Sequence, residues 1–193
     1  MVGGRQPPTC GGGFILFGRL MTRYKRLFCC AVALSLLFGG CRRKSEKEFQ
    51  PSKLSPELFS GQSLQTVERK LTMMAGDFDI LVDRSPLPSD TRPPYRLLVI
   101  SKKNARINGQ SGELVLTFFN DRLMTTQFFS ADLAAARAAV EAAERISLSG
   151  LEAHIEPSTR VWVGKDENGR GYIGWIDKKL QAEQDAWVKQ YGQ

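Results

Sequence analysis

The stretch ELVLTFFNDRLMTTQFF, residues 113–129, decides the fold of this 193-residue chain. Two runs rich in apolar, β-branched and aromatic residues flank Asn120 and Asp121, a dipeptide that suits a two-residue hairpin turn. The register that this turn predicts pairs Phe118 with Leu123, Leu116 with Thr125 and Leu114 with Gln127. One face of the hairpin is therefore mostly apolar and is expected to face a core.

Helices and further strands are expected on both sides of this hairpin. Ser63 precedes a helical repeat of apolar residues, and Asp132 or Ser130 precedes an alanine-rich helix. Asp177 is the expected cap of a last helix. Strands are expected near 78–82, 95–101, 159–164 and 171–176, and the proline-rich segment 85–94 is a predicted loop. The pattern predicts an α+β fold: a largely antiparallel sheet of two hairpins with three packed helices.

The charge of the chain is unevenly distributed. It has 27 lysines and arginines against 20 aspartates and glutamates, but nine of the basic and two of the acidic residues lie in 1–48. Residues 49–193 therefore carry 18 of each sign. The net charge of +7 gives no reason to expect a nucleic-acid partner.

The N-terminal part contains an uncharged twelve-residue run, 27–38, directly after a basic stretch and before Gly39, Gly40 and Cys41. A helix needs about 20 apolar residues to cross a bilayer, so this run is too short. A basic start, a short apolar centre and small residues at the end are typical of a secretion signal.

The sequence Leu37-Phe38-Gly39-Gly40-Cys41 resembles the lipobox of bacterial lipoproteins, with Phe38 where leucine is usual. The resemblance implies cleavage after Gly40 and acyl chains on Cys41 that tether the protein to a membrane. Since Arg42 and not aspartate follows the cysteine, it also implies the outer membrane, with the protein facing the periplasm.

These features predict four segments. Residues 1–20 are an extension ahead of Met21, the expected true start; 21–40 are the signal peptide; 41–58 are the lipid anchor and a flexible, proline-containing linker; and 59–193 form a single α+β domain. Cys10, Cys29 and Cys30 would leave with the signal, so no disulfide is expected in the mature chain.

A second resemblance covers residues 59–129. Gly61-Gln62-Ser63 leads into a helix with Val67 and Leu71, and a strand ends at Phe118-Phe119-Asn120-Asp121-Arg122-Leu123. This arrangement is similar to small outer-membrane lipoproteins of the barrel-assembly accessory type, which share a helix–sheet fold with β-lactamase inhibitor proteins. The Leu-Gly-x-Pro of that family is absent after the helix.

Trp162, Ile173 and Trp175 form a candidate contact patch. They share one face of the second hairpin if its loop has four residues. An outward face would suit a partner or a glycan; an inward face would be core beneath the last helix.

No catalytic, metal or cofactor site is expected. No cysteine follows Cys41, the common serine-hydrolase motifs do not occur after it, and Asp166 begins a predicted hairpin turn more readily than a calcium loop. We therefore expect a lipid-anchored, non-catalytic binding or scaffold module for an envelope protein. The alternative is an envelope hydrolase or glycan-binding enzyme with dispersed carboxylates such as Asp77, Asp79 and Glu113.

Overall fold

The structure, a computed structural model, describes residues 49–74 and 76–192. The predicted extension, the signal peptide, the Gly40 cleavage position and the Cys41 lipidation position lie outside the described residues. The elements named below all belong to the compact unit Phe49–Gln193.

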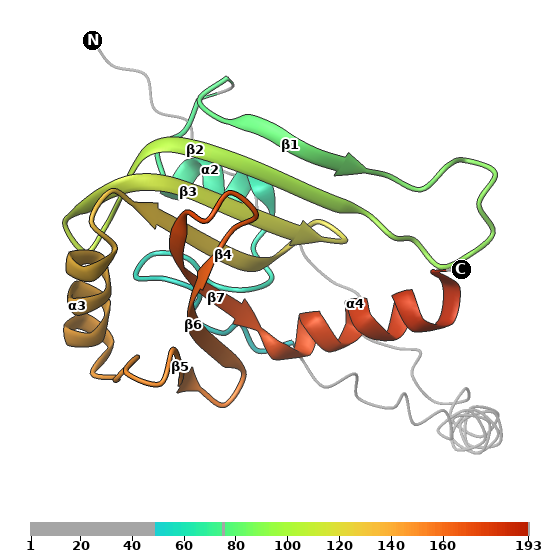
Figure 1. Cartoon of the computed structure of the whole chain (residues 1–193). Helices are drawn as coiled ribbons and strands as arrows, with labels where there is room; N and C mark the ends of the chain where they lie inside the picture. Colours follow the sequence, from blue (N-terminus) through green and yellow to red (C-terminus); the bar gives the residue numbers. More distant parts are fainter. Residues whose placement is uncertain (1–48, 75, 193) are drawn as a thin grey trace, which may run out of the picture. The chain divides into compact units, whose positions relative to one another are not determined.

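A single antiparallel sheet dominates this unit, and three helices accompany it (Figure 1). The elements, in chain order, are α2 (Leu64–Lys70), β1 (Asp79–Arg84), β2 (Leu97–Ile107), β3 (Gln110–Phe119), β4 (Arg122–Ser130), α3 (Leu133–Glu144), β5 (Glu152–Glu156), β6 (Thr159–Lys165), β7 (Gly171–Asp177) and α4 (Lys178–Tyr191). The seven strands lie in the order β1-β2-β3-β4-β7-β6-β5.

The predicted arrangement of two hairpins with three packed helices is wrong. There is one continuous seven-stranded sheet, and strands account for about 40% of the structure against 23% for helices. The two hairpins join because β4 pairs with β7 from Thr125–Ile176 to Phe128–Ile173. That pairing connects segments far apart in the chain, so it cannot be predicted from any local sequence pattern.

The hairpin that decides the fold has the predicted turn and part of the predicted register. Asn120 and Asp121 have φ values of 48° and 61°, as a type I′ turn requires. Phe118 pairs with Leu123 as expected, but a register shift beyond Thr117 pairs Leu116 with Thr126 and Leu114 with Phe128. The shift matters because it turns the bulky Phe128 toward the core in place of Gln127.

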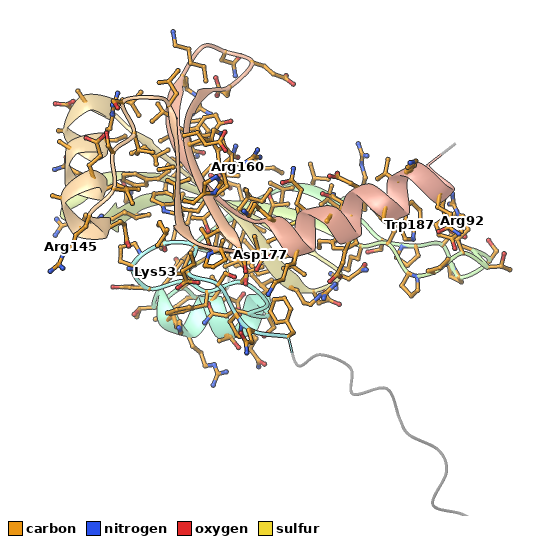
Figure 2. The ribbon with its side chains drawn as sticks, turned by 90° about the horizontal axis from the view of Figure 1, so that it is seen from below. Lys53, Arg92, Arg145, Arg160, Asp177 and Trp187 are labelled. Atoms are coloured by element: carbon orange, nitrogen blue, oxygen red, sulfur yellow. The ribbon has the colours of Figure 1, made fainter. Side chains whose placement is uncertain are left out.

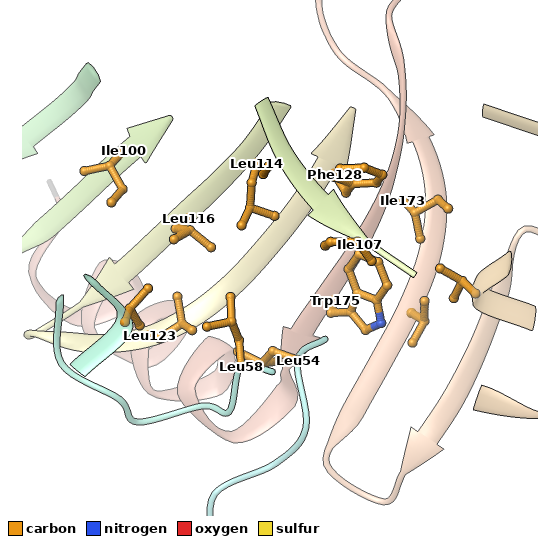
Figure 3. Packing of buried hydrophobic residues seen from close by; sticks show 14 of the residues in the cluster. Leu54, Leu58, Ile100, Ile107, Leu114, Leu116, Leu123, Phe128, Ile173 and Trp175 are labelled. Carbon is orange, nitrogen blue, oxygen red and sulfur yellow. The ribbon is translucent and has the colours of Figure 1, made fainter. Parts of the chain in front are cut away.

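One face of the sheet, here called the core face, is covered by α2, α3 and the segment 52–62. Val67 of α2 and Ala136 and Val140 of α3 belong to the same buried cluster as the apolar residues of the strands. Figure 3 shows part of this cluster, with Leu54 and Leu58 beside the strands. The small side chains of α3 allow a close approach to the sheet.

Residues 49–58 belong to the fold, although the sequence predicts a flexible linker there. Leu54 is 0% and Leu58 is 1% exposed, and the Ser52 amide donates a hydrogen bond to Ser60 Oγ at 2.8 Å. Two leucines among charged and proline residues are too few to show periodicity. Their burial is decided by the sheet against which they pack.

The helix α4 lies on the opposite face, at one end of the sheet. Asp177 caps it as predicted, accepting from the amides of Lys179 and Leu180. Leu180 packs against Phe119, Met124 and Ile176. Farther along, Trp187 donates to the Pro93 carbonyl and lies beside Arg92, so the proline-rich loop holds the helix end (Figure 2).

None of the helices in the described part of the chain has the length and apolar character needed to cross a membrane.

Candidate functional site

The part of the second sheet face that α4 leaves uncovered, here called the open face, carries a row of aromatic side chains. Phe129 of β4, Tyr172 of β7 and Trp162 of β6 are all partly exposed. The ring centroids of Phe129 and Tyr172 are 5.1 Å apart, and those of Tyr172 and Trp162 are 6.1 Å apart. The Trp162 indole also donates to the Tyr172 hydroxyl at 3.3 Å. The three rings therefore form one connected aromatic surface.

Two glycines let the Trp162 and Tyr172 rings lie close to the sheet backbone. Trp162 pairs with Gly174 across β6 and β7, and Gly164 pairs with Tyr172. A Cβ atom on Gly174 would overlap the Trp162 indole, and one on Gly164 would lie 2.8 Å from the Tyr172 ring. Each ring thus rests on the bare backbone of the opposite strand, which fixes its position before any partner binds.

An arginine stands at each end of this row. The guanidinium of Arg160 lies 5.5 Å from the centre of the Trp162 ring, and that of Arg170 lies 4.6 Å from the centre of Phe129. Arg160 pairs with Ile176 at the end of β7, and both Arg160 and the neighbouring Asp177 are labelled in Figure 2. Cation–π contacts of this kind keep the arginine head groups over the sheet beside the aromatic row.

The loop between β6 and β7 orients Arg170. The Asp166 carboxylate accepts from the amides of Asn168 and Arg170 and from the Arg170 guanidinium at 2.7 Å. Partial desolvation raises the pKa of Asp166, but the hydrogen bonds from Arg170 and Asn168 outweigh it and leave the pKa lowered. The predicted hairpin turn is confirmed, with Gly169 at φ +78°.

This loop has five residues, 166–170, because Lys165 pairs with Gly171. The candidate patch of Trp162, Ile173 and Trp175 depends on a four-residue loop, and a slip of one residue moves a side chain to the other face. Ile173 and Trp175 are 0% exposed in the main core. Trp162 lies on the open face, so the three residues do not form one surface.

The reading of these residues as core beneath the last helix is also only partly right. Ile173 and Trp175 are core, but they face α2, α3 and the segment 52–62. It is Trp162 that packs against the cluster containing Leu180 of α4.

The three dispersed carboxylates suggested for catalysis each have another partner. Asp77 accepts from the Met74 amide at 2.8 Å, and Asp79 forms an ion pair of 3.3 Å with Lys103. Glu113 accepts from Ser101 Oγ at 2.5 Å and from Arg170 at 2.8 Å. The Ser101 hydrogen bond is the main cause of a lowered Glu113 pKa, opposed by partial burial and assisted by Arg170. A general acid needs a raised pKa, so Glu113 is poorly suited to that role.

Within residues 49–74 and 76–192, no three histidine, cysteine, aspartate or glutamate side chains converge as a metal site would require.

We expect Glu113→Gln to lower the unfolding free energy at pH 7 by about 1 kcal/mol, because a partly exposed ionic hydrogen bond is lost. The folded pKa of Glu113 lies below its ordinary value of 4.5. The ionised carboxylate therefore stabilises the fold above about pH 4.5, and this contribution is lost as the pH falls through the folded pKa. Urea unfolding at about pH 7, 5 and 3 measures the effect.

The matched control is Glu167→Gln in the neighbouring loop, which is exposed. In this variant, the unfolding free energy should vary with pH as it does in the parent protein. In Glu113→Gln, the unfolding free energy should fall less steeply as the pH is lowered. Equal curves for the two variants would contradict the assigned network.

Sequence reasoning missed most of the open face, including Phe129, Tyr172, Arg160 and Arg170. The sequence GYIGW, residues 171–175, contains a usable signal. Glycine in a strand often marks a close approach by another group, and here Trp162 covers Gly174.

No protein-family model matches this chain, and no curated protein matches it either. The functional argument therefore depends on the sequence and on the geometry of the open face.

Proposed function

We propose that this chain is a lipid-anchored, non-catalytic binding module of the bacterial cell envelope, tethered through acyl chains on Cys41 after cleavage behind Gly40. Its domain faces the periplasm, most favourably from the outer membrane, and binds an envelope protein. The tether is supported by the basic stretch, the short apolar run and the lipobox-like residues 37–41. Two or more acyl chains are enough for stable anchoring.

The observation that carries the binding role is the row formed by Trp162, Tyr172 and Phe129 with Arg160 and Arg170 at its ends. Tryptophan, tyrosine and arginine are the residues most enriched among those that dominate protein interfaces. Their rings already rest on glycines, so a partner would pay little conformational entropy to use them.

The open face also has the polarity that a protein partner requires. Gln127 and Thr117 are partly exposed beside the aromatic row, and Glu113 and Arg170 form an ion pair of 2.8 Å at its edge. An apolar centre bordered by polar and charged groups is the usual anatomy of a non-obligate interface. The hydrolase alternative has no comparable support, because its three carboxylates serve other contacts.

Site-specific photo-crosslinking in a bacterial host tests this proposal. A photoreactive amino acid at Gln127, in the middle of the open face, should yield a discrete crosslinked envelope protein. The same residue at Ala138, exposed on α3 on the opposite side, is the matched control and should not yield it. Arg160→Glu should reduce the product about tenfold or more by reversing a charge at the interface.

The anchor is tested in the same cells by membrane fractionation. The chain should sediment with the outer membrane at its mature size, and Cys41→Ser should shift it out of that fraction as an unprocessed or soluble form. An unchanged fraction and size for Cys41→Ser would refute the lipid tether. Crosslinks that are equal from Gln127 and Ala138 would refute the open face as the binding surface.

A further inference from the structure

A cavity of about 410 Å³ lies on the core-face side of the sheet, away from the open face. It is enclosed by the loop 55–58, the end of α2 and the second half of β2, and α2 lies beside β2 and β3 (Figure 1). Its size falls within the range of about 300–1,000 Å³ that is common for small-molecule sites.

The walls of this cavity carry more positive than negative charge. Lys70 and Lys102 contribute to its lining, against one carboxylate, that of Glu57, which leaves a formal surplus of one positive charge. Arg106 also borders the cavity, but it lies between the buried Ala105 and Ile107 on β2, so its side chain belongs to the opposite face of the sheet. Lys70 Nζ is 3.1 Å from the Glu57 backbone carbonyl, to which it donates. The lining therefore favours a ligand with negative charge.

The strand geometry places Lys102 in an unusual position for a lysine. It pairs with Leu114, whose side chain is on the core face, and it is only partly exposed. Its neighbour Lys103 is exposed and pairs with Asp79 at 3.3 Å. Among the residues that the structure describes, Lys102 has no carboxylate within ion-pair distance. The Lys102 stem lies on the core face while its ammonium reaches the cavity unpaired, where it is available to an anion.

A second polar group in the cavity also lacks a partner. The side-chain nitrogen Nδ2 of Asn108 is buried and has no hydrogen-bond acceptor in the described part of the chain. Asn108 and Gly109 have φ values of 48° and 79° in the turn that joins β2 to β3, so the position of Asn108 is fixed by the hairpin. Buried donors are nearly always satisfied, and this one points to an acceptor supplied by a ligand.

The floor of the cavity is apolar. Leu58 and Leu114 are each 1% exposed, and Ala105 and Ile107 are each 6% exposed; three of these residues are labelled in Figure 3. A ligand that fits would therefore have an oxyanion for the cationic wall and a short apolar portion for the floor.

We propose that this cavity binds a small organic phosphate monoester, whose apolar portion rests on Leu58, Ile107 and Leu114. Lys102 and Asn108 donate to the anionic oxygens, and Lys70 adds positive charge at the mouth. This proposal does not depend on the open face or on the lipid tether.

Isothermal titration of the full chain, purified in a non-ionic detergent, tests the proposal with butyl phosphate as the probe. We expect saturable binding with one site per chain, and binding of inorganic phosphate weaker by about tenfold, because the apolar floor then contributes nothing. Lys102→Met should weaken butyl phosphate binding by about tenfold or more through loss of a charge-assisted hydrogen bond.

The matched control is Lys103→Met, one residue along the same strand, which should leave the affinity unchanged. Asn108→Ala should weaken binding severalfold, and thermal unfolding of each variant verifies that it is folded. A phosphate monoester could come from a lipid head group or from a free metabolite, and dibutanoyl phosphatidic acid distinguishes the two. If it binds more tightly than butyl phosphate, the site belongs to a lipid head group. If the two bind equally, the site belongs to a free phosphate monoester.

No detectable binding of either phosphate ester at millimolar concentration would overturn the proposal. Equal losses for Lys102→Met and Lys103→Met would also overturn it, since the effect would then be one of general surface charge.

Discussion

Trp175→Ala is expected to lower the unfolding free energy of this protein by about 3–5 kcal/mol. Trp175 has the largest of the fully buried side chains and is 0% exposed. It lies in the middle of β7, between Thr126 of β4 and Val161 of β6. Truncating a buried tryptophan removes its transfer free energy and leaves a cavity that neighbouring strands cannot fill. A loss of this size is a large part of the total stability of about 5–15 kcal/mol typical of a domain.

Urea unfolding followed by far-ultraviolet circular dichroism measures this loss without relying on tryptophan fluorescence. Trp187→Ala is the comparison, since Trp187 is only partly buried, near the end of α4. It should cost markedly less than Trp175→Ala, although it loses the hydrogen bond to the Pro93 carbonyl. Similar losses for the two variants would show that β7 is not at the centre of the core.

Gly112→Ala is expected to lower the unfolding free energy by about 3 kcal/mol. A Cβ atom at this position of β3 would overlap the backbone carbonyl oxygen of Phe129 and lie 2.8 Å from the ring of Phe128. The first of these contacts is with backbone, so rotation of a side chain cannot relieve it, and β3 and β4 must separate locally. Overpacking of this kind costs about 1–3 kcal/mol, and we place Gly112 at the upper end.

Gly150→Ala is the matched control, because a Cβ atom there would meet nothing within 4 Å. Its unfolding free energy should stay within about 0.5 kcal/mol of the parent protein. Amide hydrogen exchange should also show faster opening of β3 and β4 in Gly112→Ala alone. If the two glycine variants were equally stable, the close pairing of β3 with β4 around Gly112 would be wrong.

Local features of the fold could be predicted where the information lies within a few residues. The turn at Asn120 and Asp121 and the caps at Ser63, Asp132 and Asp177 are all found where expected. Each of these depends on one short segment and its own hydrogen bonds. Asn108-Gly109 is an equally strong turn signal that the sequence reasoning missed, although it joins β2 to β3.

Predictions failed where the outcome depended on a one-residue shift in strand register or on pairing between segments far apart in the chain. The shift beyond Thr117 could not be read from the alternation of apolar residues, because Thr125 and Thr126 fit either face. The Arg170 amide donates to the Asp166 side chain, which keeps Arg170 in the loop before β7 as its fifth residue. With this loop length, Trp162 lies on the opposite face from Ile173 and Trp175. A period of two makes every such slip exchange the buried and exposed faces.

The open face and the cavity also combine features that short segments determine with features that depend on distant pairings. Trp162 was a predicted contact residue, but its aromatic and arginine neighbours on the open face come from β4, β6, β7 and the loop 166–170. The cavity combines residues of α2, of the loop 55–58 and of β2. Lys102 lies on its side of the sheet and Lys103 does not, because successive residues of a strand point to opposite faces.

The amino-acid sequence alone was sufficient to predict the turn at Asn120 and Asp121 and the helix starts, because these depend on short-range sterics and hydrogen bonds. It also predicts the processing signal that precedes the domain. Only the tertiary structure decided that the two hairpins join into one seven-stranded sheet, that residues 49–58 are buried, and which side chains share the open face and the cavity. These features depend on pairings between distant segments, whose free energy comes from packing that no single segment contains.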